Sequence, residues 1–98
     1  MSPTNLPRIA AVSAAPGLML HVWWQSGEES LIDVSGPVNT YRVYRPLRDN
    51  PALFGQVRLG EYGTDVAWTD WVDMSADMLW HLALEQSTAP ALAHHTAN

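Results

Sequence analysis

The sequence contains no cysteine and no lysine. Without cysteine the chain can build no disulfide framework, thiol nucleophile or thiolate metal site, and nothing in it points to an oxidising compartment. Without lysine, Schiff-base chemistry is excluded. The chain also lacks an apolar run of the roughly 20 residues that span a bilayer, and its N-terminus lacks the pattern of a signal peptide. We therefore expect a cytoplasmic protein that neither crosses nor enters a membrane.

Positive charge is also scarce, because 5 arginines face 10 aspartates and glutamates, which gives a formal net charge of −5. The electrostatic attraction that drives nonspecific nucleic-acid binding is therefore missing overall, and we expect no direct nucleic-acid binding. Four of the arginines nevertheless lie between positions 42 and 58. They form either a local basic patch or an ordinary solvated face with ion pairs.

The composition that remains is that of a globular domain, with 47% hydrophobic and 15% charged residues among 98. A chain of this length can bury one modest core. We predict an N-terminal arm over residues 1–7, a single domain over 8–86 and a flexible tail over 87–98, where Ala, Thr, Pro and His follow no period. Five tryptophans are a large number for a chain of this length, so their side chains should make up much of the core or of an interface.

The first half of the domain reads as strands. An apolar run over 8–15 precedes the turn Pro16-Gly17, and residues 18–24 then alternate with a period of two. Both faces of that second strand are largely apolar, which predicts a central position in the sheet. The polar stretch 25–28 contains Gly27 and predicts a tight hairpin to a return strand over 29–34, which Gly36-Pro37 ends.

The second half is less regular, and residues 38–47 receive no assignment. Asn50 followed by proline predicts a short helical turn that reaches Phe54. Alternation around 57–59 and 66–68 predicts a second hairpin, and a helix follows with Ser75 as its N-cap. The predicted fold class is α+β, with a small antiparallel sheet of two hairpins, four or five strands in all, and a C-terminal helix packed on it.

Several short pieces of the sequence form a pattern together. They are Gly27-Glu28, Ile32-Asp33-Val34, Pro46-Leu47-Arg48-Asp49, Phe54, and the stretch from Trp68 through Asp70, Trp71 and Asp73 to Asp77 and Leu79. The chain resembles the bacterial domain-of-unknown-function family 2442 over about residues 9–84. The resemblance implies a small α+β fold like the N-terminal domain of a Nitrosomonas family member, and no known reaction.

The resemblance also implies a context for function. Some members of the family carry a helix-turn-helix DNA-binding domain after this one, and others are encoded beside a small protein in an arrangement like a toxin and antitoxin pair. Both contexts suggest regulation through protein contacts. Only a short segment follows Glu85 here, in contrast to the fused members.

No catalytic motif stands out. The acidic residues could form a carboxylate site; they are Asp65, Asp70, Asp73 and Asp77. Structural roles explain them better, because Asp70 lies in a predicted turn, Asp73 can accept hydrogen bonds from backbone amides at the start of the helix, and Asp77 complements the helix dipole. The histidines are not spaced as a chelate, since His94 and His95 are adjacent in the tail, His81 falls on the polar helix face, and His21 reads as a half-buried packing residue. We expect no enzyme activity, no metal and no cofactor.

The adjacent pair Trp23 and Trp24 is the most informative feature, because strand alternation makes it unusual for both to face one core. Either another part of the chain covers the second tryptophan or a partner does. The first hypothesis is a noncatalytic protein-interaction module, either a homodimer or the antitoxin-like half of a two-protein complex. The alternatives are a small-ligand sensor and, least favoured, an enzyme that uses the Asp70 and Asp73 region. The candidate interaction surface comprises Trp23, Trp24, Trp71, Arg42, Arg45 and Arg48.

Overall fold

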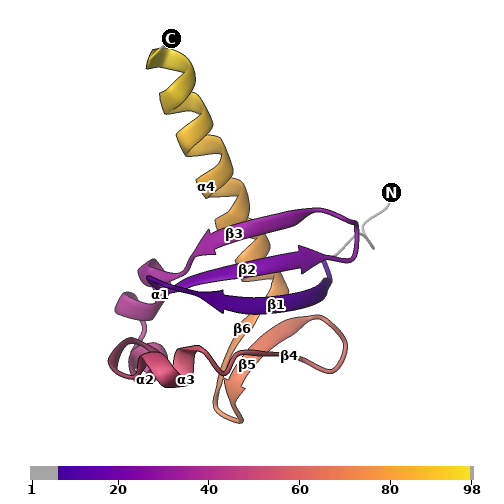
Figure 1. The fold of residues 1–98 in the computed structure, drawn as a ribbon, viewed down its shortest axis with the longest axis vertical. Helices are drawn as coiled ribbons and strands as arrows, with labels where there is room; N and C mark the ends of the chain where they lie inside the picture. The colour runs from indigo at the N-terminus through magenta and orange to yellow at the C-terminus, as the bar shows by residue number, and fades with distance from the viewer. Residues whose placement is uncertain (1–6, 98) are drawn as a thin grey trace.

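The computed structural model describes the backbone of residues 7–97 and the side chains of residues 7–86. It contains two three-stranded antiparallel sheets and a long C-terminal helix (Figure 1), which confirms the predicted α+β class. In chain order the elements are β1 (Ile9–Ala15), β2 (Met19–Trp24), β3 (Glu29–Asp33), α1 (Ser35–Thr40), η1 (Arg42–Tyr44), α2 (Arg45–Asp49), α3 (Pro51–Phe54), β4 (Arg58–Leu59), β5 (Asp65–Thr69), β6 (Val72–Ser75) and α4 (Ala76–Ala97).

Strands β1, β2 and β3 form the first sheet, here called sheet A, in that order. The predicted central position of β2 is thus confirmed, as is the hairpin from β2 to β3, in which Gly27 adopts a φ of 101°. Along β2 every second side chain is buried, beginning with Leu20 and ending with Trp24. Because strand side chains alternate, Met19, His21 and Trp23 project from the opposite face of the sheet.

Residues 35–54, which include the unassigned stretch 38–47, form the short helical segments α1, η1, α2 and α3. Strand β3 ends at Asp33, one residue before the predicted end, and Gly36 and Pro37 lie inside the first turn of α1, where proline costs no hydrogen bond. The predicted helical turn after Asn50 is confirmed as α3. The Asn50 side chain accepts a hydrogen bond from the backbone amide of Leu53 at 3.3 Å.

Strands β4, β5 and β6 form the second sheet, sheet B. The predicted second hairpin is present as β4 and β5, although β4 is only two residues long. The sequence analysis missed β6 and treated its residues as the approach to the helix. Val72 and Met74 are buried in it while Asp73 and Ser75 are exposed, and a run of four residues is too short to reveal that alternation. The six strands therefore make two sheets where the sequence predicted one of four or five.

Helix α4 begins as predicted, because the Ser75 hydroxyl accepts a hydrogen bond from the amide of Met78 at 3.0 Å. Its backbone stays helical to Ala97, beyond the expected end near Glu85. The arm over 1–7 falls almost wholly outside the described residues, and the flexible tail over 87–98 stays a prediction. Within the described part of the chain, no helix is both long and apolar enough to cross a membrane.

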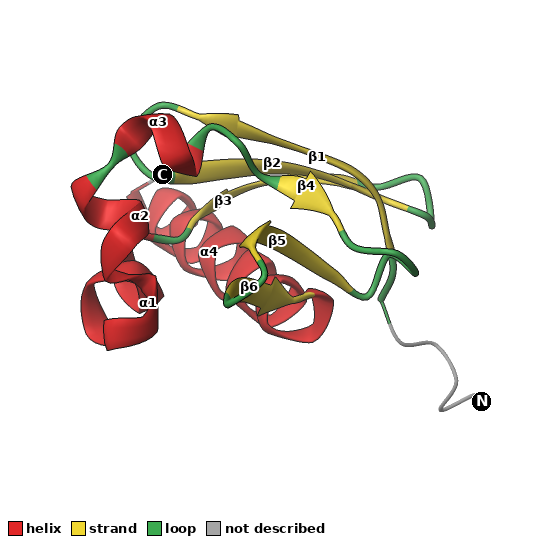
Figure 2. Cartoon of the chain, turned by 90° about the horizontal axis from the view of Figure 1, so that it is seen from below, coloured by secondary structure: helices red, strands yellow, loops and turns green. Residues whose placement is uncertain are grey.

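One core joins the two sheets. Figure 2 shows α4 and the strands of sheet B on the inner side of sheet A, with α1, α2 and α3 grouped at the end where β1 turns into β2. The buried side chains of both sheets and of Leu79 in α4 belong to one apolar cluster. The sheets also meet where Ile9 donates its amide to the carbonyl of Gly63 at 2.7 Å. Gly63 has a φ of 72°, and a Cβ there would stand 2.6 Å from the Ile9 oxygen, so this contact requires glycine.

Candidate interaction surface

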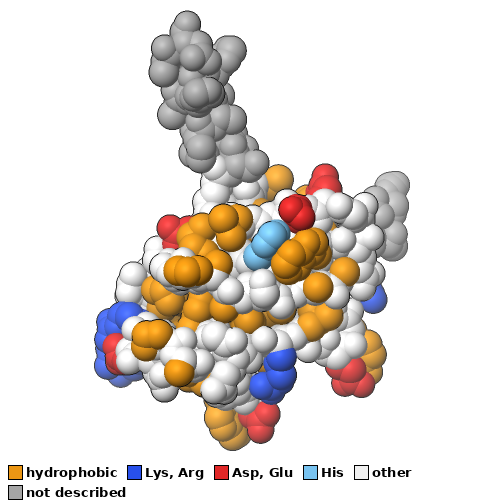
Figure 3. Space-filling model, viewed as in Figure 1, with side chains coloured by type: hydrophobic (Ala, Val, Ile, Leu, Met, Phe, Trp, Pro, Cys, Tyr) orange, Lys and Arg blue, Asp and Glu red, His pale blue; other side chains and the backbone are white. Residues whose placement is uncertain are grey.

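The side of sheet A that faces away from the core is open, and we call it the outer sheet face. Figure 3 looks onto it and shows apolar side chains spread across the sheet with a histidine among them. At its centre His21 lies between Ser13 of β1 and Leu31 of β3, which is 58% exposed. The half-buried Trp23 follows at the hairpin end of this face, in register with Glu29. The strand registers place nine residues on this face, namely Ala11, Ser13, Ala15, Met19, His21, Trp23, Glu29, Leu31 and Asp33.

Trp23 and His21 form a stacked pair on this face. Their ring centroids are 3.9 Å apart and their planes differ by 20°. Nε2 of His21 lies 3.6 Å from Oε1 of Glu29 on the neighbouring strand, and the His21 side chain is 34% exposed, so its predicted half-buried position is confirmed. Stacking orients the indole along the sheet, which reduces the conformational entropy that a partner would have to remove on binding.

Trp24, which we also placed on the candidate surface, is a core residue with 3% exposure, and that assignment is corrected here. Its ring packs edge to face against Trp80 of α4 at 5.1 Å, and its Nε1 donates to the hydroxyl of Ser30 at 2.9 Å. The alternation of β2 makes this outcome unavoidable once Leu20 and Val22 face inward. Only one of the two adjacent tryptophans can reach the outer sheet face.

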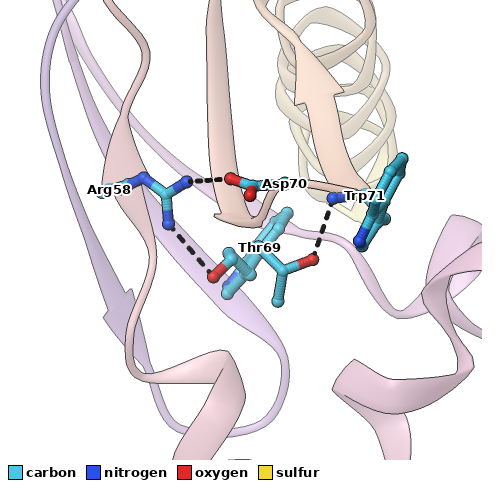
Figure 4. A network of polar contacts seen from close by, with 5 residues as sticks. Arg58, Thr69, Asp70 and Trp71 are labelled. Atoms are coloured by element: carbon cyan, nitrogen blue, oxygen red, sulfur yellow. Dashed lines mark hydrogen bonds and ion pairs between the residues drawn. The ribbon is translucent and has the colours of Figure 1, made fainter.

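Trp71 lies at the turn between β5 and β6 and is 84% exposed, the highest exposure among the large apolar side chains of the described residues. Figure 4 shows the polar contacts that fix this turn. The Thr69 hydroxyl accepts from the amide of Trp71 at 3.1 Å, and Arg58 donates to the carbonyl of Trp68 at 3.2 Å while its other terminal nitrogen is 3.7 Å from the Asp70 carboxylate. The turn is therefore ordered by its polar groups, and the indole of Trp71 is left to solvent.

The three arginines of the candidate surface lie on η1 and α2, outside the outer sheet face, and all are exposed. Arg42, Arg45 and Arg48 follow one another at intervals of three, so they border one hollow of about 170 Å³ beside the end of α1. Arg48 pairs with Asp49 at 3.0 Å. The candidate residues thus occupy three separate places: the outer sheet face, the η1–α2 segment and the turn before β6.

The acidic residues do not gather into a site. Asp70 pairs with Arg58, and Asp77 lies in the first turn of α4, 3.6 Å from Nδ1 of His81. Asp73 is exposed on β6, while Asp65 is half-buried beside Gly60. Among residues 7–86, no three acidic or histidine side chains come close enough together to hold a metal ion.

Sequence reasoning overlooked two residues that shape the surface. Leu31 was placed correctly opposite Ile32, but its exposure was not recognised, although the burial of Ile32 and Val34 on the other face implies it. Leu18 was treated as an ordinary strand residue, and it adopts a φ of 59° instead. No residue pattern predicts a positive φ for leucine, because the left-handed region brings the Cβ atom of a residue too close to the backbone.

Among the comparisons with known proteins, only the one with solved structures gave a match. No protein-family model matches the sequence, and no curated protein sequence does. Among solved structures, the chain is similar to a protein of Nitrosomonas europaea ATCC 19718 named "Putative DNA Binding Protein", with a TM-score of 0.77 and 27% sequence identity. The match covers 90% of this chain and 56% of that one, so this chain spans little more than half of its structural neighbour. The likeness is consistent with the family resemblance seen in the sequence.

Proposed function

We propose that this protein is a noncatalytic protein-interaction module of the family 2442 type, and that it binds a partner protein through the outer sheet face. The observation that carries the proposal is the apolar pair on that face: the exposed Leu31 lies opposite His21, and the half-buried Trp23 is stacked on the same histidine. A solvated face of an antiparallel sheet is normally lined with polar side chains. Tryptophan is enriched among the residues that anchor protein interfaces, which are surrounded by a polar rim.

The charges at the rim favour a different protein over a second copy of this chain. Glu29 and Asp33 are the two ends of β3, which is an edge of sheet A, and Glu28 immediately precedes the strand. Antiparallel pairing of two β3 strands about Leu31 would set Glu29 against Asp33 of the other copy, and like charges in directly opposed positions are destabilising. The net charge of −5 adds to that repulsion. A partner with an apolar centre and basic flanks complements this face.

The size of the face constrains the complex. Three strands spaced by about 4.8 Å and six residues long give a footprint on the order of 300 Å². A standard interface buries about 800 Å² on each partner. The contact must therefore extend beyond sheet A, and a helix or small domain that crosses the sheet and reaches β3 would do so.

The experiment is to co-express the chain with the product of its neighbouring gene and to measure masses by size-exclusion chromatography with light scattering. We expect a monomer for the chain alone and a stable complex for the pair. Trp23→Ala should weaken the complex roughly tenfold or more, since interface tryptophans are frequent hot spots. Trp71→Ala is the matched control, because it removes an exposed tryptophan from another part of the molecule. A dimer of the chain alone, no complex with the neighbour, or a loss caused only by Trp71→Ala would each overturn the proposal.

DNA binding, which the name of the structural neighbour suggests for that protein, is not part of our proposal for this chain. This chain carries twice as many acidic as basic residues, which disfavours attraction to the phosphate backbone. Fluorescence anisotropy with labelled duplex DNA at low salt should show no saturable binding.

We also propose no catalytic role for Asp70 and Asp73, since the first is paired with Arg58 and the second is exposed on β6. The small-ligand alternative rests on a different part of the molecule.

A further inference from the structure

A groove of about 410 Å³ lies between the turn that joins β1 to β2 and the helices α2 and α3. Figure 2 shows these helices beside that end of sheet A. Small-molecule sites usually have volumes of about 300–1,000 Å³. The walls are mostly apolar, and they include Ala14, Leu18, Leu47, Pro51 and Phe54. Leu47 and Phe54 are buried core residues, so the base of the groove rests on the core of the domain, and the accessible apolar surface belongs to Ala14, Leu18 and Pro51.

One wall of the groove is held in an unfavourable conformation. Leu18 has a φ of 59°, directly after Gly17 at 79°, and it is the one residue other than glycine with a positive φ in the described part of the chain. The left-handed region costs a residue with a side chain roughly 1–2 kcal/mol. The carbonyl of Leu18 accepts a hydrogen bond from Val34 at 2.9 Å, which anchors the turn to the end of β3. Strain of this kind concentrates at ligand sites, where the surrounding structure maintains it.

The groove ends at the arginines. Arg48 borders both the apolar groove and the polar hollow that Arg42 and Arg45 line. Nε of Arg48 contacts Asp49, which leaves its two terminal nitrogens available. Within the part of the chain that the structure describes, no carboxylate lies within ion-pair distance of Arg42 or Arg45. Three guanidinium groups and one carboxylate therefore leave an excess of positive charge at one end of an apolar channel.

We propose that the groove and these arginines form one binding site for a small anionic amphiphile, an unbranched acyl chain that ends in a carboxylate. The acyl chain lies along Ala14, Leu18 and Pro51, where it buries apolar surface that solvent can reach, and the carboxylate accepts hydrogen bonds from Arg48 and Arg45. Guanidinium forks match the geometry of a carboxylate. The net charge of −5 disfavours a long polyanion at the same arginines, whereas a single carboxylate meets only their local field.

The test is isothermal titration calorimetry with decanoate below the concentration at which it forms micelles. We expect saturable binding of one decanoate per chain. Decanol, which lacks the charge, and acetate, which lacks the chain, should each bind at least roughly tenfold more weakly. Arg48→Gln should weaken decanoate binding about tenfold, the effect of losing one charge-assisted hydrogen bond. Arg8→Gln is the matched control, since it removes the same charge from an exposed position outside the groove.

A second variant tests the groove without touching charge. A Cβ at Gly55, which lines the groove, would meet its nearest atom, the Ala52 carbonyl oxygen, at 3.5 Å, which is ordinary contact. Gly55→Leu should therefore fold, with an unchanged circular dichroism spectrum, and should lose decanoate binding because its side chain fills the groove. Equal binding of decanol and decanoate, binding that survives both variants, or tight binding of an apolar peptide with a free C-terminus where decanoate fails would overturn the proposal.

Discussion

Single residues tie the irregular segment to the sheets. Tyr44 of η1 is 9% exposed, and its hydroxyl donates to the carbonyl of Asp73 in β6 at 2.8 Å. Burial raises the pKa of the Tyr44 hydroxyl, and the negative charge of Asp73 and the neighbouring Tyr41 raise it further. The neutral phenol is thus favoured in the folded state. Its hydrogen bond connects η1, which has no clear sequence pattern, to β6, the strand that was not predicted.

Tyr44→Phe should lower the free energy of unfolding by about 1 kcal/mol at pH 7, because one hydrogen bond is lost and nothing replaces it. Since the folded state raises the pKa, the contribution of Tyr44 is complete below its ordinary value of 10.0 and is lost as the pH rises through the folded value. Urea unfolding at pH 7 and pH 10.5 measures this. The variant should show a smaller decrease between the two pH values than the wild type, and an equal decrease would contradict the assignment.

At the scale of the element, short helical segments depend on their ends. Isolated helices shorter than about 12 residues are marginal in water, so α1, α2 and α3 depend on caps and packing. At the end of β3, the Asp33 carboxylate accepts from the amide of Ser35 at 2.8 Å, and the hydroxyl and amide of Ser35 together lower the pKa of Asp33. The side chain of Gln86 in α4 pairs with both backbone polar groups of Asp33 at 2.8 Å, which closes that end of the sheet edge.

Asp33→Asn should destabilise the protein at pH 7 by less than about 1 kcal/mol, because the carboxylate is exposed and solvent screens its charge. A lowered pKa means that the contribution is present above the ordinary value of 3.8 and is lost as the pH falls through the folded value. The difference between wild type and variant should therefore decrease progressively as the pH falls below 3.8. Glu61→Gln, which removes one charge from an exposed turn, is the control, and a difference that does not decrease as the pH is lowered would exclude the mechanism.

At the scale of the whole molecule, the two sheets share one apolar cluster, so they should unfold together. Leu79 of α4 is fully buried in this cluster. Leu79→Ala should cost about 2–5 kcal/mol, since a buried leucine loses its transfer energy and leaves a cavity. Tryptophan fluorescence and far-ultraviolet circular dichroism, followed through urea unfolding, should give one coincident transition in both proteins. Separate transitions would show that sheets A and B are independent units.

The sequence by itself determined the α+β class, the hairpin from β2 to β3, the capped starts of α3 and α4, and the chemistry that the absent cysteine and lysine exclude. These features depend on neighbours in the chain, through side-chain alternation and backbone capping. It also determined that Trp23 and Trp24 must face opposite sides of their strand.

Only the tertiary structure decided which of those sides meets the core, that Trp24 packs against Trp80, and that residues 35–49 become helical. It also decided that the strands divide into two sheets and that Leu18, Arg48 and Phe54 meet around one groove. The physical reason is that alternation defines the two faces of a strand but does not determine which face meets the core. Short segments, in turn, take the conformation that buries their apolar side chains. Both depend on contacts between residues far apart in the chain, which local sequence patterns do not encode.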